Sequence, residues 1–288
     1  MKNKILIAGG GGMLAWDFGR IAVEHGYDVL SVTHGEMDIA DPSSVWAAIK
    51  GFKPNYVVNA SGIDVDACEI NPSDGYRVHT WAATVLAQAC ERISATLVYM
   101  SSCGLFGDDL TFYSEYDPVV LKTKYARSKY LGELEAQQHC QRVFVVRCGW
   151  LFGGTPSHRR NFVFQRIKEA KQNTVINSAG DKYGSPTLTS DLSEKILALL
   201  STDLYGTYHI SNAEGCSRYE YTTYILHSVG LKTHVEKVDS SAFPRPASTP
   251  DSEMLTNLKL QFSNIGVLGS WQEAIERYVA SLKKDVCV

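Results

Sequence analysis

A short apolar run followed by four glycines, close to the N-terminus, constrains the fold of this chain more than any other feature. Residues 4–8 read Lys-Ile-Leu-Ile-Ala, residues 9–12 are all glycine, and a helical pattern then covers residues 13–25. Glycine allows a tight turn here, and the free N–H groups at the start of a helix bind an anionic phosphate. The pattern therefore predicts a dinucleotide-binding site in which the contacting residues are Gly9, Gly11, Gly12, Met13 and Leu14.

Further apolar runs alternate with helical patterns along the first half of the chain. The predicted strands are residues 4–8, 27–33, 55–59, 96–100 and 143–147, and the predicted helices are residues 13–25, 43–50, 82–93 and 125–140. Continuous apolar strands that alternate with helices indicate a parallel sheet covered on both faces, which is a doubly wound α/β (Rossmann) fold. Ligands bind such a sheet at the carboxyl ends of its strands.

The pattern becomes looser after residue 150. It predicts helices at residues 161–172, 188–200, 219–229 and 271–283, a strand at residues 206–210, and a proline-rich loop at residues 242–250. We expect residues 1–150 to form the dinucleotide-binding domain. We expect residues 151–288 to form mainly a smaller substrate-binding lobe, with some segments returning to the sheet.

The composition argues against several classes of partner. The chain has 28 Lys and Arg against 31 Asp and Glu and no basic block, so we expect no nucleic-acid and no membrane partner. The apolar residues 5–8 are too few for a signal core, and we expect a cytoplasmic protein. The seven cysteines form no CxxC pair and the His and Cys spacings fit no zinc pattern, so we expect reduced thiols and no metal.

The end of the second predicted strand bears on the choice of cofactor. An acidic residue that binds the ribose hydroxyls of NAD is often found there, but residues 33–35 read Thr-His-Gly. Glu36 is either a displaced acid or a solvated loop charge. The missing carboxylate favours NADP(H) and leaves NAD(H) open. Asp38 and Ile39 are predicted to flank the adenine; the alternative for this segment is that Asp41 caps the following helix.

Tyr125 and Lys129 lie four residues apart at the start of a predicted helix, so the phenol and the ammonium share one face. A nearby cation stabilises phenolate and lowers the pKa of tyrosine, which suits proton donation to a carbonyl. Ser101 and Ser102 end the fourth predicted strand, where a hydroxyl can bond the same substrate oxygen. A surface pair on the helix and a serine turn cap are the structural alternatives. The three features in this order predict a nicotinamide-dependent reductase.

With these residues in view, the chain resembles an extended short-chain dehydrogenase of the dTDP-4-dehydrorhamnose reductase family. The similar segments are residues 57–69, 145–153, 161–162, 181–187, 206–212 and 245–246. The resemblance implies reduction of the 4-keto group of a nucleotide-linked 6-deoxysugar by a hydride from NAD(P)H. Tyr125 would be the acid, Lys129 its partner and ribose anchor, and Ser102 the hydroxyl that bonds the ketone.

The resemblance also implies further site residues. Ala60, Ser61 and Gly62 would contact the cofactor. Trp150 and Asn161 would lie against the sugar, and Arg245 would meet the nucleotide diphosphate with its two-pronged guanidinium. Each has a structural alternative: Trp150 as a core aromatic, Asn161 as a helix cap, and Arg245 as a surface charge. The sequence is compatible with a homodimer but does not predict one.

Several positions depart from the family pattern. Cys103 and Gly104 stand where the family usually has Asp and Tyr beside the sugar, so Cys103 is a substrate-binding candidate that alters which keto-sugar fits. His79 stands where Asn is frequent, and it either preserves a polar contact or is a structural histidine.

Other functions stay open beside this reading. One is a reductase of a GDP-, UDP- or CDP-linked keto-sugar. Another is a non-catalytic NADP-binding regulatory subunit that resembles the methionine adenosyltransferase beta subunit, although such a subunit has no need of a proton donor. An epimerase or dehydratase also uses this fold, but Cys103 and Gly104 supply no extra acid–base pair for a dehydratase.

Overall fold

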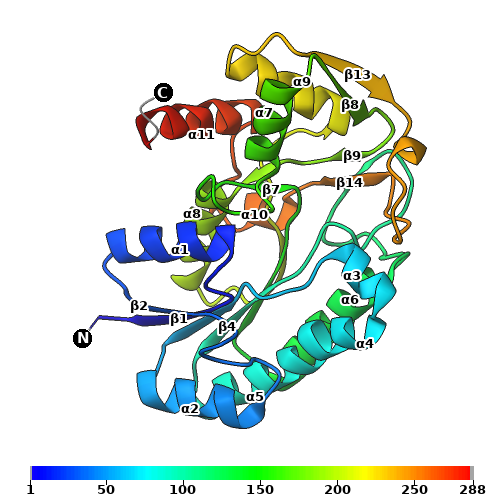
Figure 1. Ribbon diagram of the computed structural model, residues 1–288. Helices are drawn as coiled ribbons and strands as arrows, with labels where there is room; N and C mark the ends of the chain where they lie inside the picture. Colours follow the sequence, from blue (N-terminus) through cyan, green and yellow to red (C-terminus); the bar gives the residue numbers. More distant parts are fainter. Residues whose placement is uncertain (1, 286–288) are drawn as a thin grey trace.

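The computed structural model describes residues 2–285, and a six-stranded parallel sheet lies at its centre (Figure 1). The strands follow the spatial order β2-β1-β3-β4-β6-β11. Their bounds are β1 (Lys4–Ala8), β2 (Asp28–Val32), β3 (Tyr56–Asn59), β4 (Thr96–Met100), β6 (Val143–Arg147) and β11 (Gly206–His209). The chain passes from β1 to β2 on one side and then crosses to β3 on the other. This reversal opens a crevice at the carboxyl ends of β1 and β3.

Helices cover both faces of the sheet because successive strand side chains point in opposite directions. Ile5 and Ile7 pack against α1 (Met13–Glu24), α8 (Thr189–Leu200) and α10 (Leu258–Phe262). Leu6 and Ala8 pack against α2 (Pro42–Phe52), α5 (Ala82–Ile93) and α6 (Lys124–His139). Figure 1 shows α1 above the sheet and α2 and α5 below it. The predicted doubly wound fold is confirmed.

The later part of the chain builds a second apolar core from α7 (Phe162–Gln172), α9 (Arg218–Ser228) and α11 (Trp271–Asp285). These helices lie at the far end of the molecule from α2 and α5 (Figure 1). The short strands outside the central sheet are β5 (Phe112–Tyr113), β7 (Leu151–Phe152), β8 (Val175–Ala179), β9 (Tyr183–Gly184), β10 (Thr187–Leu188), β12 (Cys216–Ser217), β13 (His234–Val238) and β14 (Ser252–Leu255). Because α8, β11 and α10 pack on the central sheet, the chain after residue 150 contributes to both regions.

Short helical segments connect these elements. They are α3 (Val65–Ile70), α4 (Pro72–Gly75), a π-helical turn (Tyr76–Trp81) that leads into α5, and a 3-10 turn (Ser240–Ala242). The π-helical turn interrupts the regular pattern of hydrogen bonds where it packs against α6.

The sequence predicted the regular elements well. The strands at residues 4–8, 96–100 and 143–147 and the helix at residues 82–93 have the predicted bounds, and the other predicted elements end within one or two residues of the prediction. The paired strands β8 and β13 and the short helices α3 and α4 were not predicted. Six cysteines are free, buried thiols, as expected; Cys287 lies outside the described residues. Within residues 2–285, no helix has the length and apolarity needed to cross a bilayer.

Candidate active site

A cavity of about 800 Å³ opens at the carboxyl ends of β1 and β3. The glycine turn, the segment after β3 and the start of α6 all reach it. The predicted site residues among its lining are Gly11, Gly12, Met13, Leu14, Ala60, Ser61, Gly62, Tyr125 and Lys129. The structure therefore brings together the side chains and turns that we predicted to bind the cofactor and to donate the proton.

The glycine turn has the shape that a bound dinucleotide requires. Gly9 has a φ of +89°, and a Cβ built on it would lie 2.9 Å from the backbone of both Ala60 and Ser61. Gly9 therefore lies under the cavity and lets the turns after β1 and β3 approach closely. A Cβ on Gly11 would meet nothing within 4 Å. Gly12 begins α1 without a side-chain cap, so the first N–H groups of the helix stay available to a phosphate.

The predicted adenine segment is engaged in other contacts. The Asp38 carboxylate accepts a hydrogen bond from Ala40 N and pairs with Arg77, while Ile39 is buried in the core. The structure does not place either residue among those that line the cavity. Glu36 Oε2 accepts hydrogen bonds from Thr33 N and Oγ1, both at 2.8 Å, which lowers the pKa of Glu36. Asp41 caps α2, so this alternative is confirmed.

Tyr125 lies where the cofactor cavity meets a second cavity of about 470 Å³, and it lines both. Thr123 caps α6 through a 3.0 Å bond from Ala126 N and so fixes the start of the helix that carries the phenol. Ser102 lines the second cavity, and its Oγ accepts a hydrogen bond from Gly104 N at 3.0 Å. The bond from Gly104 N uses only a lone pair of Ser102, so the hydroxyl hydrogen is left for the Tyr125 oxygen or for a ligand. Ser101 lines both cavities, but its hydroxyl donates to Glu133.

The charges at this point differ from the sequence expectation. Burial raises the pKa of Tyr125, and a hydrogen bond with Ser102 opposes this rise without cancelling it. Our expectation of a lowered Tyr125 pKa is wrong, because burial has the larger influence. The Lys129 ammonium donates to Met100 O at 3.0 Å. Burial also lowers the pKa of Lys129 to about 8. Tyr125 thus keeps its proton at neutral pH, as a proton donor must.

His79 ties the turn after β3 to the catalytic helix. Its Nε2 accepts a hydrogen bond from Ile63 N at 3.1 Å, and its Nδ1 lies 2.9 Å from Ser128 Oγ. Because Ser128 Oγ donates to Tyr125 O, Nδ1 must donate to Ser128 Oγ, and the ring is therefore neutral. Burial and the charge of Lys129 lower the pKa of His79 to about 2. The ring also packs edge-on against Tyr125, with centroids 5.3 Å apart.

The second cavity brings together most of the predicted substrate residues. Cys103, Trp150 and Arg245 line it with Ser102 and Tyr125. However, Arg245 donates two hydrogen bonds to the Asp66 carboxylate, from Nε at 3.0 Å and from Nη2 at 3.1 Å.

Asn161 is not among the residues that line the second cavity. Its side chain is fully buried, caps α7 by accepting from Phe164 N, and donates to Gly153 O and Tyr278 Oη. In the structure, Asn161 is therefore the N-cap residue of α7.

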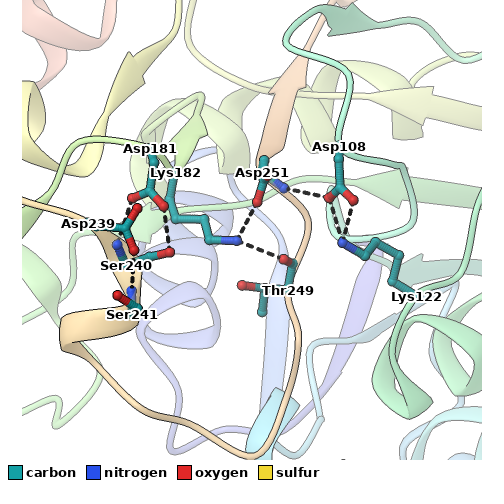
Figure 2. A network of polar contacts seen from close by, with 9 residues as sticks. All are labelled: Asp108, Lys122, Asp181, Lys182, Asp239, Ser240, Ser241, Thr249 and Asp251. Atoms are coloured by element: carbon teal, nitrogen blue, oxygen red, sulfur yellow. Dashed lines mark hydrogen bonds and ion pairs between the residues drawn. The ribbon is translucent and has the colours of Figure 1, made fainter.

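A network of polar contacts holds one wall of the second cavity (Figure 2). Lys182 Nζ reaches Asp251 at 2.5 Å and Thr249 O at 3.0 Å. Asp251 N donates in turn to Asp108, which pairs with Lys122. On the other side of Lys182, the Asp181 carboxylate accepts from Ser240 N and Oγ. The loops around residues 181, 240 and 250 are thus bonded to one another, although they lie far apart in the sequence.

Several residues that line the two cavities were not predicted. The basic run Ser157, His158, Arg159 and Arg160 borders the cofactor cavity, and Lys182, Arg218 and Glu253 border the second cavity. A glycine pair followed by basic residues at 153–160 was a usable signal for an anion site. Arg218 and Glu253 carried no signal, because only the folding of distant loops brings them to the cavity. Among residues 2–285, no cluster of three or more His, Cys, Asp or Glu side chains is arranged to hold a metal ion.

The parallel sheet, the glycine turn and the Tyr125–Lys129 helix together define an extended short-chain dehydrogenase fold. Within this class, the chain belongs to the family described as RmlD substrate binding domain, which it matches over residues 2–284. It is 32% identical to the spore coat polysaccharide biosynthesis protein SpsK of Bacillus subtilis, over 96% of this chain and 97% of that protein.

Other relatives carry a reductase name. The dTDP-4-dehydrorhamnose reductase of Mycobacterium tuberculosis is 29% identical, over 97% of this chain and 93% of its own length. The solved structure of dTDP-4-dehydrorhamnose reductase from Bacillus anthracis in complex with NADP is similar with a TM-score of 0.93 and 29% identity, and the match covers 98% of this chain and 100% of that one.

Proposed function

We propose that the chain is an NAD(P)H-dependent reductase of the 4-keto group of a dTDP-linked 4-keto-6-deoxysugar. The observation that carries the proposal is the position of Tyr125, which lines both the cofactor cavity and the second cavity beside Ser102 and one helical turn before Lys129. A proton donor at this junction can serve a ketone in one cavity while a hydride arrives from the other. The reductase names of relatives that match along nearly the whole chain support the same reaction.

The residues of the chain would divide the work as follows. The bound dihydronicotinamide supplies the hydride that adds to the keto carbon. The Tyr125 hydroxyl gives its proton to the ketone oxygen as negative charge develops there. Ser102 donates a hydrogen bond to the same oxygen and stabilises that charge. The Lys129 ammonium stabilises the phenolate that is left on Tyr125 until solvent returns a proton.

We propose NADP(H) as the preferred cofactor and keep NAD(H) as the alternative. The open space above Gly11 and the uncapped start of α1 suit a pyrophosphate. After β2, the carboxylate of Asp38 is paired with the Arg77 guanidinium, which reduces its repulsion of a 2′-phosphate. The relative from Bacillus anthracis was solved in complex with NADP.

Some finer statements remain predictions. These are the division of the chain near residue 150 into a cofactor-binding and a substrate-binding part, a homodimer, a cytoplasmic location, and the absence of a nucleic-acid partner. The sugar contacts of Cys103, Trp150 and Asn161 and the diphosphate contact of Arg245 are also proposals. For Asn161 the burial of the side chain argues against a direct contact, and for Arg245 a diphosphate would have to compete with Asp66.

A substrate panel tests the proposal. The purified protein is mixed with NADPH or NADH and with 4-keto-6-deoxysugars linked to dTDP, GDP, UDP or CDP, and the loss of reduced nicotinamide absorbance is followed. We expect turnover with the dTDP-linked sugar and a higher kcat/KM with NADPH. Cofactor binding without turnover on any of these sugars would contradict the proposal and favour a regulatory binding subunit.

A further inference from the structure

Arg218 differs from the other cations that line the second cavity. Lys182 is paired with Asp251 and Arg245 is paired with Asp66. The Arg218 guanidinium forms no hydrogen bond and no ion pair with another side chain among residues 2–282, although burial lowers its pKa. A half-buried guanidinium has five N–H donors, and donors at the edge of a cavity require an acceptor from solvent or from a ligand.

Trp150 fixes the position of this guanidinium. Arg218 lies over the indole ring, with Cζ 3.4 Å from the ring centroid. The indole Nε1 of the same tryptophan donates to Glu253 Oε2 at 2.7 Å. One aromatic side chain therefore holds a cation on its face and a carboxylate at its edge.

The free oxygen of Glu253 lies close to the reacting end of the cavity. A Cβ built on Gly104 would lie 3.0 Å from Glu253 Oε1 and 3.4 Å from Ser102 Oγ. Glu253 Oε1 therefore comes near the hydroxyl that is proposed to bond the ketone. The charge of Glu253 also contributes to the raised pKa of Tyr125, and the charge of Arg218 acts on the nearby thiol of Cys103.

A free carboxylate oxygen and free guanidinium donors, held on one tryptophan, complement a group that both donates and accepts hydrogen bonds. A sugar hydroxyl is such a group, whereas a charged substituent would face a like charge from one of the two residues. We propose that Arg218 and Glu253 recognise the hydroxyl on the ring carbon next to the ketone, and so select neutral, hydroxylated keto-sugars over deoxy or charged ones. This inference rests on the proposed reductase function.

The test compares two substrates that differ in this hydroxyl: the dTDP-linked 4-keto-6-deoxysugar and its 3-deoxy analogue. We expect the wild type to prefer the hydroxylated sugar by about 100-fold or more in kcat/KM, because buried polar groups left unpaired disfavour the analogue. Arg218→Met should lower kcat/KM by roughly 10- to 100-fold for the hydroxylated sugar and by less than about threefold for the analogue. Glu253→Gln, which keeps the shape of the side chain, should act in the same direction.

Arg92→Met is the matched control, because Arg92 also lies over a tryptophan, 5.8 Å from the ring centroid of Trp46, but on α5 and not along the cavity. Its discrimination should equal that of the wild type, and NADPH affinity should be unchanged in all three variants. Equal losses on both substrates in Arg218→Met and Glu253→Gln would overturn the inference and leave the reductase function intact. If the wild type reduces no keto-sugar, both this inference and the proposed reductase function are wrong.

Discussion

The two cavities that meet at Tyr125 are built in different ways. The cofactor cavity is made largely from consecutive turns of the central sheet, namely those after β1, β3 and β4, together with the start of α6. The second cavity is made mainly from loops that come from distant parts of the chain and are bonded to one another by polar side chains.

The ion pairs of the two regions show the same contrast. Glu133 and Arg147, under β4 and β6, have side chains that are 3% and 7% exposed. Asp66 and Arg245, at the second cavity, are 35% and 44% exposed. The first region thus contains a buried ion pair that is costly to break, and the second contains a partly exposed pair that solvent can replace. We infer that cofactor binding depends on a rigid frame, while substrate choice depends on adjustable loops.

The largest expected effect lies at the junction of the two regions. Tyr125→Phe removes the proton donor and keeps the ring that packs edge-on against His79. We expect kcat to fall by roughly 10²- to 10⁴-fold, the usual contribution of a positioned acid. NADPH affinity, measured by fluorescence titration, should change by less than about twofold, because the cofactor cavity keeps its shape. Turnover that survives this substitution would remove Tyr125 from the mechanism.

The second prediction tests the rigid frame. Arg147→Met leaves Glu133 buried without its cation, with the Ser101 hydroxyl as a remaining partner. We expect the free energy of unfolding, measured in urea, to fall by about 3–5 kcal/mol.

The matched control for the rigid frame is the double variant Arg147→Met with Glu133→Leu, which removes both charges. It should recover a large part of the loss, because no unpaired charge remains. A loss below about 1 kcal/mol in the single variant would mean that this pair is no stronger than a surface pair, and the proposed contrast would fail.

The same contrast explains how much the sequence could predict. The strands at residues 4–8, 96–100 and 143–147 are nearly continuous apolar runs, so their buried positions were evident in the sequence. The glycine turn and the Tyr125–Lys129 pair were predictable because each depends on local spacing. β8 and β13 were missed because both alternate with exposed residues and pair only with each other. The stacking of Arg218 on Trp150 joins the first residue of α9 to the residue before β7, and no local pattern links the two.

The third prediction concerns pH and the burial of Lys129. Because burial lowers the pKa of Lys129 to about 8, the ammonium loses its proton as the pH rises through this value. Since kcat/KM reports the free enzyme, it should be highest below pH 8 and fall about tenfold per pH unit well above it. Because His79 has a pKa of about 2, it should cause no change of kcat/KM between pH 5 and 8.

Lys129→Arg is the control for this pH profile, because arginine stays charged throughout the range. The variant should be less active, yet its kcat/KM should lack the decline that begins near pH 8. If the decline persists in this variant, another group titrates there and the role assigned to Lys129 is wrong.

The smallest expected effect tests the adjustable loops. Asp66→Asn removes the charge that pairs with Arg245 and keeps an oxygen for the bond from Ala247 N. Because both partners are partly exposed, the free energy of unfolding should change by less than about 1 kcal/mol, and the change should shrink in about 0.5 M salt. Freed from Asp66, Arg245 gains access to a substrate diphosphate, so KM should stay the same or fall. A rise in KM of tenfold or more would show instead that the ion pair itself shapes the cavity, and the second region would then be as rigid as the first.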